Sequence, residues 1–575
     1  MVIYTSAWPS VPIIEESIFS HVFNSKLCSP GQVVYIDGPT GQRFTQANVK
    51  HSALSLAHGL RNELHTPNFC GPLLSRGDTV MVFSQNNVLY PTLMWGIFAA
   101  GLRATLASSI ASPNEVKEQW IDSGSKVMIV SSSLVHTAWR MFKLLNFEPE
   151  DAFNRMIVYS DGENVQLPKD FKFTRYEDLS TRGLLSKEES FDGKLSNETA
   201  LLCYSSGTSG KPKGVGTTHR NLVAQLSMLR SIEAPEMRVQ SIICPVPLYH
   251  VYGAVNCLMM PIYQGIESVL MPKFEMAEFL RCIDAYQVTH AWVVPPICMG
   301  LLGYPLLKNY KLTSLKTLIS SAAPLPAGVQ QMLHKKYSTG GRTVYITQGY
   351  GMTELSPAAL AMMPWEGFES AGAAGRLLPN LEARLVDDDG NDLPESEESV
   401  GELWIRGPTV MKGYLNNPSA TKDAITEDGW LKTGDIAKRD KKGFFRIVDR
   451  KKELIKYNGF QVPPAELEGI LITHPNVADA GVVGVEVNGV ELPRAYIVLR
   501  KPTKDVAAQH LIAKEVQEWI KPRVGKPKHL RGGVVVIAEI PKSPPGKILR
   551  RVLRERAAKE VLEAGEKLRA ISTRL

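Results

Sequence analysis

A glycine- and hydroxyl-rich loop between residues 204 and 214 has the composition of an anion-binding site. It reads Tyr-Ser-Ser-Gly-Thr-Ser-Gly-Lys-Pro-Lys-Gly, after a strand expected over 200–204 and before a helix expected from about residue 220. Glycines let backbone N–H groups approach a ligand, hydroxyls donate hydrogen bonds, and lysine supplies positive charge. The loop therefore predicts a polyphosphate site. It is not a Walker A loop, because Pro212 and Gly214 stand where that pattern needs Gly and Ser or Thr.

The elements that must position this loop follow from patterns in the first 350 residues. Short β-branched runs alternate there with segments of helical periodicity, and this alternation predicts parallel α/β layers. Strands are expected at 79–83, 126–130, 156–159, 291–294 and 343–347, and helices at 49–62, 114–122, 220–231 and 275–286.

The pattern changes near residue 380 and again after Arg450. Strands separated by acidic or glycine-rich turns predict a smaller, mainly antiparallel unit, at 381–386, 401–405 and 443–448. After the charged stretch 449–452 a separate α+β unit is expected, with strands near 478–486, 494–500 and 533–538 and helices near 463–472, 506–520 and 547–563. The predicted domains are residues 1–449, with a β-rich part at about 380–448, and residues 450–575.

Composition indicates a globular protein with an uneven charge distribution. The chain has 575 residues, too many for one ordinary core, and its 44% apolar content excludes an extended disordered chain. The net charge of +7 leaves nucleic acid, a membrane surface and phosphorylated ligands as candidate partners. Residues 450–575 carry 24 basic and 14 acidic side chains, a net +10, whereas the preceding residues carry a net −3. The basic excess therefore belongs to the C-terminal quarter.

Several features bear on the cellular compartment. The seven cysteines include no CxxC pair, which predicts reduced, buried thiols and an intracellular protein. No apolar run reaches the roughly 18 residues of a membrane span, and acidic residues interrupt the N-terminus too early for a secretory signal. The tripeptide Thr-Arg-Leu at 573–575 approaches a peroxisomal signal. The expected location is cytoplasmic or peroxisomal.

The loop and a series of further motifs resemble the adenylate-forming superfamily, which includes acyl- and aryl-CoA ligases, luciferases and peptide-synthetase adenylation domains. The motifs begin, in chain order, at residues 205, 247, 320, 348, 401, 430, 445, 456 and 541. Residues 247–253 and 541–550 look most like 4-coumarate:CoA ligase-like enzymes. The resemblance implies an α/β fold. A large N-terminal domain of two layered α/β subdomains and a β-barrel-like subdomain would precede a small mobile α+β domain.

The resemblance implies a first step in which a carboxylate attacks the α-phosphate of ATP, giving acyl-AMP and pyrophosphate. Glu354 would bind Mg²⁺, and Thr353 would contact the α-phosphate. Asp435 would accept hydrogen bonds from both ribose hydroxyls, near Arg450. The β- and γ-phosphates would be held by Ser205, Ser206, Gly207, Thr208, Ser209 and Lys213, and the adenine by Ala322, Gln348 and Gly349.

A second implied step forms the CoA thioester. Lys547 would first bridge the carboxylate and the α-phosphate as a mobile point charge. The C-terminal domain would then rotate about Lys452 and bring another face to the same cleft. That face would carry Lys456, Gly459 and Gln461, while Lys273 would contact CoA from the large domain. Asn458 departs from many plant coumarate ligases, which have Lys there.

The implied acyl pocket is mostly apolar. His250 would act as an aromatic gate beside the carboxylate, and Tyr252 and Asn256 would share a helical face toward the acyl tail. The remaining lining would come from Met299, Gly300, Gly349, Gly351 and residues 356–361. Such a lining suits aryl, phenylpropanoid-like or medium-chain acids. An α-amino acid is disfavoured because residues 248–256 contain no acid.

Two kinds of alternative remain open: ordinary structural roles for these residues, and other functions for the protein. Asp435 follows a glycine and suits a turn, Glu354 suits a helix cap, and His250 suits a packed core position. Lys547 and Lys273 suit a solvated surface. The other functions are a stand-alone enzyme that loads a carrier protein in trans, a luciferase-like oxygenase and a nucleic-acid binder. The last has only the basic C-terminal quarter in its favour, so the expected partners are a carboxylic acid, ATP and CoA, and no nucleic acid.

Overall fold

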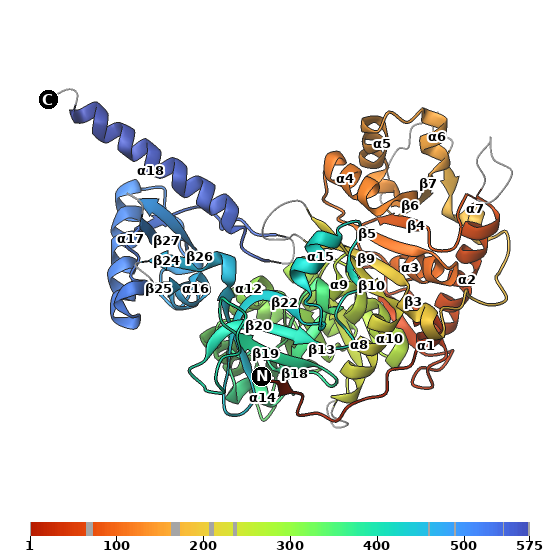
Figure 1. The fold of residues 1–575 in the computed structure, drawn as a ribbon, viewed down its shortest axis with the longest axis horizontal. Helices are drawn as coiled ribbons and strands as arrows, with labels where there is room; N and C mark the ends of the chain where they lie inside the picture. Colours follow the sequence, from red (N-terminus) through yellow and green to blue (C-terminus); the bar gives the residue numbers. More distant parts are fainter. Residues whose placement is uncertain are drawn as a thin grey trace.

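The computed structural model describes residues 2–64, 73–162, 173–205, 212–233, 238–457, 460–487, 490–543 and 546–572. Figure 1 shows two large layered regions that pack side by side, with a third, β-rich region against them. The elements after Arg450 are grouped apart from the rest, and they are called the C-terminal unit (residues 451–572) below.

The first large sheet has eight strands in the order β21-β10-β9-β5-β4-β6-β7-β8. Its central strands are parallel and buried on both faces, because alternate side chains of each strand meet different helices. Met81 and Phe83 face the core of α4 and α5, whereas Val80 and Val82 face the core of α2 and α3. The elements are β4 (Thr79–Phe83), β5 (Arg103–Ala107), β6 (Ser125–Ser131), β7 (Met156–Tyr159), β8 (Thr174–Arg175), β9 (Thr199–Ser205), β10 (Lys213–Thr218), β21 (Gly413–Tyr414), α2 (Gln46–Asn62), α3 (Tyr90–Ala99), α4 (Pro113–Ser123), α5 (Val135–Leu144), α6 (Pro149–Asn154) and α7 (Tyr176–Ser180).

The second large sheet has seven strands in the order β15-β14-β13-β11-β12-β2-β3, all parallel except β3. One apolar cluster around Trp95 joins its helices to those of the first sheet. A π-helical stretch, Ala254–Met259, continues α9 into α10. The elements are β2 (Val33–Asp37), β3 (Arg43–Thr45), β11 (Ser241–Cys244), β12 (Glu267–Leu270), β13 (His290–Val293), β14 (Thr317–Ser320), β15 (Tyr345–Gln348), α1 (Ile18–Phe23), α8 (His219–Ser231), α9 (Val251–Gly253), α10 (Met260–Gln264), α11 (Met276–Ala285), α12 (Pro295–Gly303), α13 (Ala327–Tyr337) and α14 (Glu366–Glu369).

The predicted antiparallel unit is confirmed as a five-stranded sheet, β1-β19-β20-β22-β23. Its edge strand comes from the start of the chain, because Tyr4 pairs with Ala383. A small three-stranded sheet, β16-β17-β18, lies between this unit and the second large sheet in sequence. The elements are β1 (Tyr4–Thr5), β16 (Tyr350–Gly351), β17 (Ala358–Ala361), β18 (Arg376–Leu377), β19 (Glu382–Val386), β20 (Val400–Arg406), α15 (Pro418–Ala424), β22 (Leu431–Arg439) and β23 (Phe445–Arg450).

The C-terminal unit is the predicted α+β fold. A long hairpin of β26 and β27 pairs with β28, and the helices pack on this sheet. Helix α18 runs outward past the sheet to the end of the molecule (Figure 1). The elements are β24 (Ile455–Tyr457), β25 (Phe460–Val462), α16 (Pro464–Leu471), β26 (Val477–Val487), β27 (Val490–Leu499), α17 (Val506–Ile520), β28 (Val534–Val536) and α18 (Arg550–Ser572).

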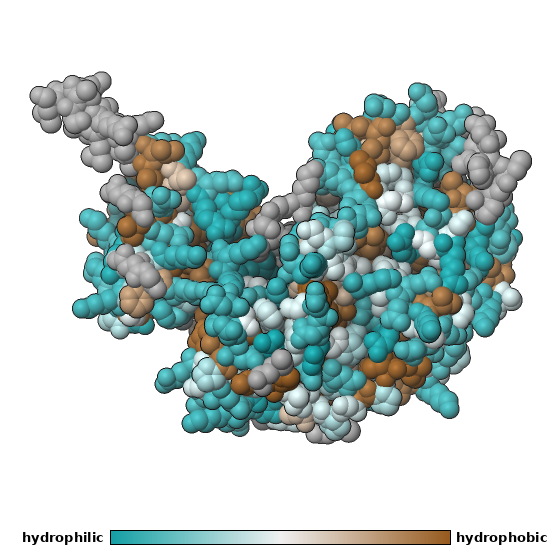
Figure 2. Space-filling view, in the orientation of Figure 1, coloured by the Kyte–Doolittle hydropathy of each residue, from teal (hydrophilic) through white to brown (hydrophobic). Residues whose placement is uncertain are grey.

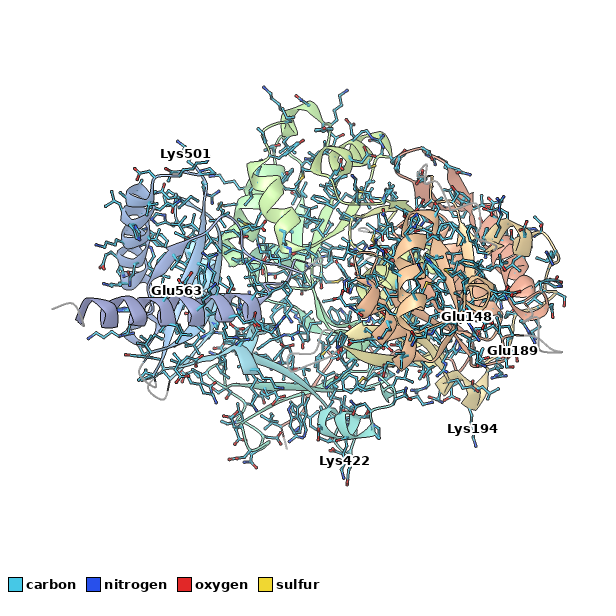
Figure 3. All side chains as sticks on the ribbon, turned by 90° about the horizontal axis from the view of Figure 1, so that it is seen from above. Glu148, Glu189, Lys194, Lys422, Lys501 and Glu563 are labelled. Atoms are coloured by element: carbon cyan, nitrogen blue, oxygen red, sulfur yellow. A yellow bond between two sulfur atoms is a disulfide. The ribbon has the colours of Figure 1, made fainter. Side chains whose placement is uncertain are left out.

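The surface is largely polar. Figure 2 shows hydrophilic residues over most of one face, with apolar residues in separate groups. Charged side chains lie at both ends of the molecule, for example Glu148 and Glu189 at one end and Lys501 and Glu563 at the other (Figure 3). None of the helices in the described ranges combines the length and the apolar character needed to cross a bilayer.

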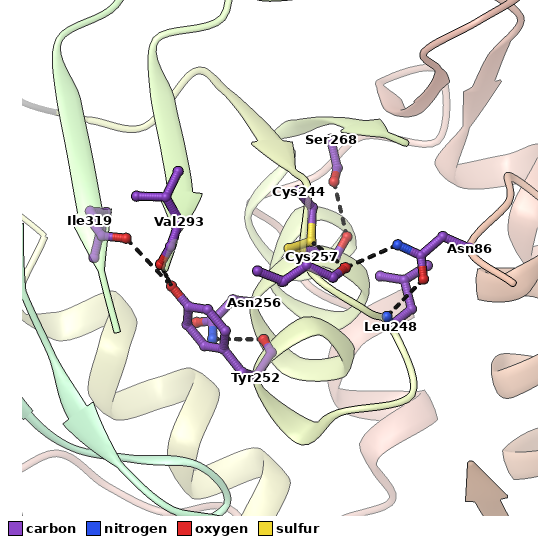
Figure 4. Close-up of a disulfide and its surroundings, with 10 residues drawn as sticks. Asn86, Cys244, Leu248, Tyr252, Asn256, Cys257, Ser268, Val293 and Ile319 are labelled. Carbon is purple, nitrogen blue, oxygen red and sulfur yellow. Dashed lines mark hydrogen bonds between the residues drawn. A yellow bond between two sulfur atoms is a disulfide. The ribbon is translucent and has the colours of Figure 1, made fainter. Parts of the chain in front are cut away.

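The helix expected from about residue 220 is confirmed as α8 (His219–Ser231), but the strand β10, which the sequence did not indicate, comes between it and the loop. β9 and β10 pair antiparallel, with Ser205 opposite Lys213. One sequence-based expectation was wrong. The cysteines are not all reduced, because Cys244 and Cys257 form a disulfide (Figure 4). It ties the end of β11 to the π-helical stretch, and proximity in the fold rather than sequence spacing brings the two thiols together.

One buried arginine holds the C-terminal unit together. Arg550, at the start of α18, is 9% exposed and pairs with Glu453 and with Glu468 on α16, the latter at 2.7 Å. Asp449 at the end of β23 lies 4.0 Å from the same guanidinium and accepts a hydrogen bond from Ala465 N. Burial raises the pKa of Glu468 to about 7, and the positive charge of Arg550 opposes that shift. Removing the arginine would leave these carboxyl groups buried without a cation.

We predict that Arg550→Met destabilises the C-terminal unit by about 3–5 kcal/mol, because breaking a buried ion pair leaves uncompensated charge. The neighbouring Arg551 is the matched control, since its side chain is 80% exposed and pairs with Glu555 one turn away. Arg551→Met should cost about 0.3–0.5 kcal/mol. Hydrogen exchange of peptides from α16 and α18 measures the difference, and equal loss of protection in both variants would contradict the role of Arg550.

Candidate active site

A cavity of about 740 Å³ lies where the two large sheets, the antiparallel unit and the C-terminal unit meet. Ser321 follows β14 and Gly349 follows β15, so the cavity lies beyond the carboxyl ends of parallel strands. That edge of an open α/β sheet is the usual place for a ligand. Lys213 reaches the cavity from the hairpin of the first sheet, and Lys547 from the C-terminal unit.

The expected adenine-site residues lie together at this edge. Ala322, Gln348 and Gly349 all line the cavity. Ala322 has a left-handed backbone, with φ of 72°, which a residue with a Cβ adopts only when its surroundings impose it. The amide of Gln348 is held by Leu325 N at 2.7 Å and by Gln330 Oε1 at 3.1 Å. These contacts fix the wall of the cavity rather than leaving it to move with a ligand.

Glu354 and Lys213 are joined through a tyrosine. Glu354 is 5% exposed, and its Oε1 accepts a hydrogen bond of 2.9 Å from the hydroxyl of Tyr414. The ammonium of Lys213 lies 4.8 Å from the centre of the same ring. Residues of β10 and β21 pair with each other, which fixes this arrangement. The phosphate-loop lysine and the carboxylate expected to bind metal therefore face the same part of the cavity.

The donor set at Glu354 fits Mg²⁺. Within the described ranges the structure has no group of three or more His, Cys, Asp or Glu side chains that could hold a metal. Magnesium does not need such a group, because it commonly keeps several waters and takes one or two carboxylates together with phosphate oxygens. A single buried carboxylate beside a lysine that is expected to hold phosphate meets that requirement.

Asp435 lies just behind the cavity wall. Its Oδ2 accepts a hydrogen bond of 2.6 Å from Tyr350, and Arg450 approaches Oδ1 at 3.5 Å. Tyr350 and Arg450 line the cavity, whereas Asp435 itself does not. Burial raises the pKa of Asp435, and the charge of Arg450 acts in the opposite direction. A diol that bound here would compete with Tyr350 for the carboxylate.

Lys547 reaches the cavity from a tight turn. Gly546 has φ of 84°, and a Cβ there would come within 2.6 Å of Pro296 on α12, so only glycine fits this contact between the two parts. Ser543 N donates to Lys547 O at 2.8 Å and closes the turn. Burial, and next the charge of Arg450, lower the pKa of Lys547 to about 8. Both the charged and the neutral form of Lys547 are therefore populated near physiological pH.

Most of the described residues expected to serve the second step lie outside the cavity lining. Lys456 and Gln461 are paired opposite each other on β24 and β25, and both are exposed and outside the cavity lining. Lys273 is also outside it, with a side chain that is 75% exposed and pairs with Glu275 at 2.8 Å. Lys452 lines the cavity. The structure thus brings Lys547 to the site and keeps Lys456 away from it.

The expected acyl-pocket residues His250, Tyr252, Asn256 and Gly351 line the cavity, as does Thr353. Burial lowers the pKa of His250 to about 4, so its ring is neutral. Asn256, in the π-helical stretch, donates to Tyr252 O of α9 at 2.9 Å (Figure 4). Gly351 must be glycine, because a Cβ would lie 2.1 Å from Pro357 O.

Other expected residues are not part of this lining. Met299 and Gly300 do not line the cavity: Met299 packs against the main apolar core, and a Cβ at Gly300 would meet Met276 on α11. Ser205 lines it at the end of β9. The remaining expected residues, Ser206, Gly207, Thr208, Ser209 and Gly459, lie outside the described residues, as does the C-terminal tripeptide 573–575.

Three tyrosines line the cavity that the sequence did not single out: Tyr204, Tyr350 and Tyr414. Tyr204 opens the loop at 204–214 and Tyr350 stands inside the motif at 348–354, so both positions were available as signals. Tyr414 contacts Glu354 across 60 residues, and Tyr204 donates to Asp122 across 82 residues. Contacts between such distant residues leave no periodic pattern in a single sequence.

The chain matches models of known families along most of its length. Residues 25–415 match the AMP-binding enzyme model, and residues 466–547 match the AMP-binding enzyme C-terminal domain. The curated relatives include "Probable 4-coumarate–CoA ligase 1" of Dictyostelium discoideum, which is 33% identical, with 96% of this chain and 97% of the relative covered. "Peroxisomal OPC-8:0-CoA ligase 1" of Arabidopsis thaliana is also 33% identical, with 92% of each covered.

A solved structure of o-succinylbenzoate CoA synthetase from Bacillus subtilis, in complex with its acyl-adenylate intermediate, has a similar fold. Its TM-score is 0.74 at 26% identity, with 93% of this chain and 98% of that chain covered. Both parts of the family pattern, the large AMP-binding region and its C-terminal domain, are present in order. The chain belongs to the AMP-binding enzyme family.

Proposed function

We propose that this protein is an AMP-forming acid–CoA ligase. The observation that carries the proposal is the composition of one cavity. Lys213 and Glu354 suit phosphates and Mg²⁺, Arg450 and Lys547 add positive charge, and the far wall beyond His250 is mostly apolar. A nucleotide and an organic acid can therefore meet in the same enclosure. The curated relatives named as CoA ligases support the same activity.

In the first half-reaction a carboxylate oxygen of the acid attacks the α-phosphorus of ATP. The new P–O bond gives acyl-AMP, and the bond to the β-phosphate breaks to release pyrophosphate. Repulsion between the two anions opposes this approach, and fixed positive charge reduces it. Lys547 and Arg450 supply that charge in a buried site, and Lys213 holds the phosphates that leave. Mg²⁺ at Glu354 would supply further charge on the phosphate oxygens.

In the second half-reaction the sulfur of CoA attacks the acyl carbonyl, and AMP leaves. Two features support a rotation of the C-terminal unit about Lys452 between the steps. Lys547 now occupies the cavity, and the Lys456–Gln461 pair faces solvent on the same unit. A rotation would exchange the two sets, and Gly459 would then lie near the thiol path. Lys273 would contact CoA at the mouth.

We infer that most of the basic excess is not catalytic. Within the described ranges, four of the basic residues after position 449 line the cavity: Arg450, Lys451, Lys452 and Lys547. Others pair with acids of the C-terminal unit, as Lys542 does with Asp479 at 2.6 Å and Lys528 with Glu466 at 2.6 Å. The positive charge that would meet ATP and CoA is therefore concentrated at the junction of the two parts.

We also propose a peroxisomal location. It is supported by the Thr-Arg-Leu ending of the sequence and by the printed name of the Arabidopsis relative. A fluorescent fusion that keeps residues 573–575 at its C-terminus should collect in peroxisomes, and the same fusion without them should not. Cytosolic fluorescence from both fusions would overturn the proposal.

The two half-reactions should separate by mutation. Lys547→Ala should lower pyrophosphate release by about 10²–10³-fold, because it removes a preorganised charge from the adenylation step. Thioester formation from supplied acyl-AMP should remain largely intact. Lys456→Ala should show the opposite selectivity. Lys526→Ala, an exposed lysine of the same unit, is the control. Equal loss of both half-reactions in the Lys547 variant would contradict the two-position mechanism.

ATP binding should weaken at alkaline pH. Below about pH 8 Lys547 is protonated and attracts the phosphates; as the pH rises through that value the charge is lost. One pH unit above the pKa about a tenth of the lysine remains charged, so affinity should fall by up to about tenfold. Calorimetric titration with Mg-ATP at about pH 7 and about pH 9 measures this fall. Lys547→Met should bind weakly at both values, and an equal fall in this variant would assign the effect elsewhere.

A further inference from the structure

Three consecutive residues around Lys452, the proposed pivot of the rotation, contact different parts of the molecule. They form one 3₁₀ turn, Lys451–Glu453. Lys451 opens the C-terminal unit in sequence, but its side chain pairs with carboxylates of the antiparallel unit. Lys452 lines the cavity, and Glu453 pairs with Arg550 of the C-terminal unit. The chain therefore passes from one set of contacts to the other within a single turn.

Lys451 is held by two carboxylates of the antiparallel unit. Its ammonium lies 3.1 Å from Glu402 on β20 and 3.1 Å from Asp388, in the segment between β19 and β20. The side chain of Glu402 is 10% exposed and that of Asp388 is 71% exposed, so water and salt screen the pair with Glu402 less. Burial acts to lower the pKa of Lys451, but the two carboxylates outweigh it and the pKa is raised, so the lysine is charged.

Glu402 is itself fixed in the antiparallel sheet. Its Oε1 accepts a hydrogen bond of 3.1 Å from Gly434 N, and Gly434 has φ of 70°, in the left-handed region that favours glycine. Gly434 precedes Asp435, and strand register places Asp435 opposite Arg450 at the end of β23. The carboxylate that holds Lys451 therefore stands on the same sheet as the expected ribose site.

The contacts of Glu453 belong to the opposite side of the pivot. Its carboxylate pairs with Arg550 at the start of α18. Ile455, two residues further on, is fully buried, and its strand β24 pairs with β25 of the C-terminal unit. A rotation of this unit would carry Glu453 with it and would leave the side chain of Lys451 on the antiparallel unit. The change in backbone angles is then confined to Lys452.

We propose that Lys451 is a positioning residue for both half-reactions. Through its ion pair with Glu402 it fixes the residue before the pivot to the antiparallel unit, so that the C-terminal unit returns to the same place in each of its two positions. A reacting group that is misplaced by about 1 Å can lose about 10²-fold in rate, so a loose pivot would slow both steps. This inference rests on the proposed function, because it assumes a rotation about Lys452.

Two variants that change the local charge in opposite directions test the proposal. Lys451→Met removes a positive charge from the cavity wall, whereas Glu402→Gln removes a negative charge and keeps an oxygen for Gly434 N. Both variants break the ion pair. Each should therefore lower kcat for pyrophosphate release, and the rate of thioester formation from supplied acyl-AMP, by about five- to tenfold. The KM for ATP should change by a smaller factor than kcat.

The double variant Lys451→Met/Glu402→Gln should be no slower than either single variant, because all three lose the same interaction. Three results would overturn the proposal. Rates that shift in opposite directions in the two single variants would assign both residues to a direct effect of charge on ATP. Loss of one half-reaction alone would assign Lys451 to one position of the C-terminal unit. Additive losses in the double variant would show that the two residues act separately.

Two further variants separate positioning from general destabilisation. Lys451→Arg keeps the positive charge between the two carboxylates and should retain most of both rates, and a loss as large as that of Lys451→Met would count against the ion pair. Lys441→Met is the matched control, because this lysine is 84% exposed and pairs with Glu397 on the same antiparallel unit. It should change both rates by less than about twofold.

Hydrogen exchange separates this inference from the proposed function. Peptides from residues 445–457 of the full-length protein without substrates should exchange about fivefold or more faster in Lys451→Met and in Glu402→Gln than in the parent protein. Faster exchange in both variants, with no acid adenylated by the parent protein, would count against the ligase function only. Unchanged exchange in both variants, with pyrophosphate release by the parent protein intact, would count against the role of Lys451 only.

Discussion

The position of Lys547 depends on one buried cation, Arg550, which lies between carboxylates. Arg550 pairs with Glu453 and Glu468 and approaches Asp449, so it joins the start of α18 to α16 and to the segment that leaves β23. Lys547 lies three residues before this arginine, just ahead of the helix. A lysine in a buried cavity needs a rigid support, because its charge is costly to place there and its side chain is flexible. The arginine network and the turn at Gly546 provide that support.

The sequence predicts the fold correctly where local residue patterns determine the secondary structure. The strand Thr79–Phe83 was found at its observed bounds because five consecutive residues suited to a buried parallel strand lie between polar segments. The hairpin that follows residue 205 was missed, since β10 contains two glycines and gains its stability from pairing with β9. The disulfide was missed for a similar reason: Cys244 and Cys257 become neighbours only when the π-helical stretch packs on β11.

The residues of the candidate site also fall into two groups, those that sequence motifs indicate and those that only the fold brings to the cavity. Four of the predicted residues stand in specific sequence motifs, and all four line one cavity: Lys213, Gln348, Glu354 and Lys547. Tyr414 and His290 stand in no such motif. Their positions follow from strand register: β21 pairs with β10, and β13 pairs with β14. Pocket lining depends on which side chains of a sheet face the enclosed space, and a single sequence does not reveal the register that decides this.

The aromatic ring between Lys213 and Glu354 has a thermodynamic consequence. Tyr414 places its face toward the ammonium and its hydroxyl on the carboxylate, so neither charged group can move without disturbing the other. A cation bound by Glu354 and an anion bound by Lys213 would then change each other's affinity, and by linkage the two changes must be equal. If Glu354 holds a cation and Lys213 a nucleotide, as proposed, the shared contacts of Tyr414 would couple the two occupancies, and the metal-free nucleotide and the metal–nucleotide complex would be distinct ligands for this chain.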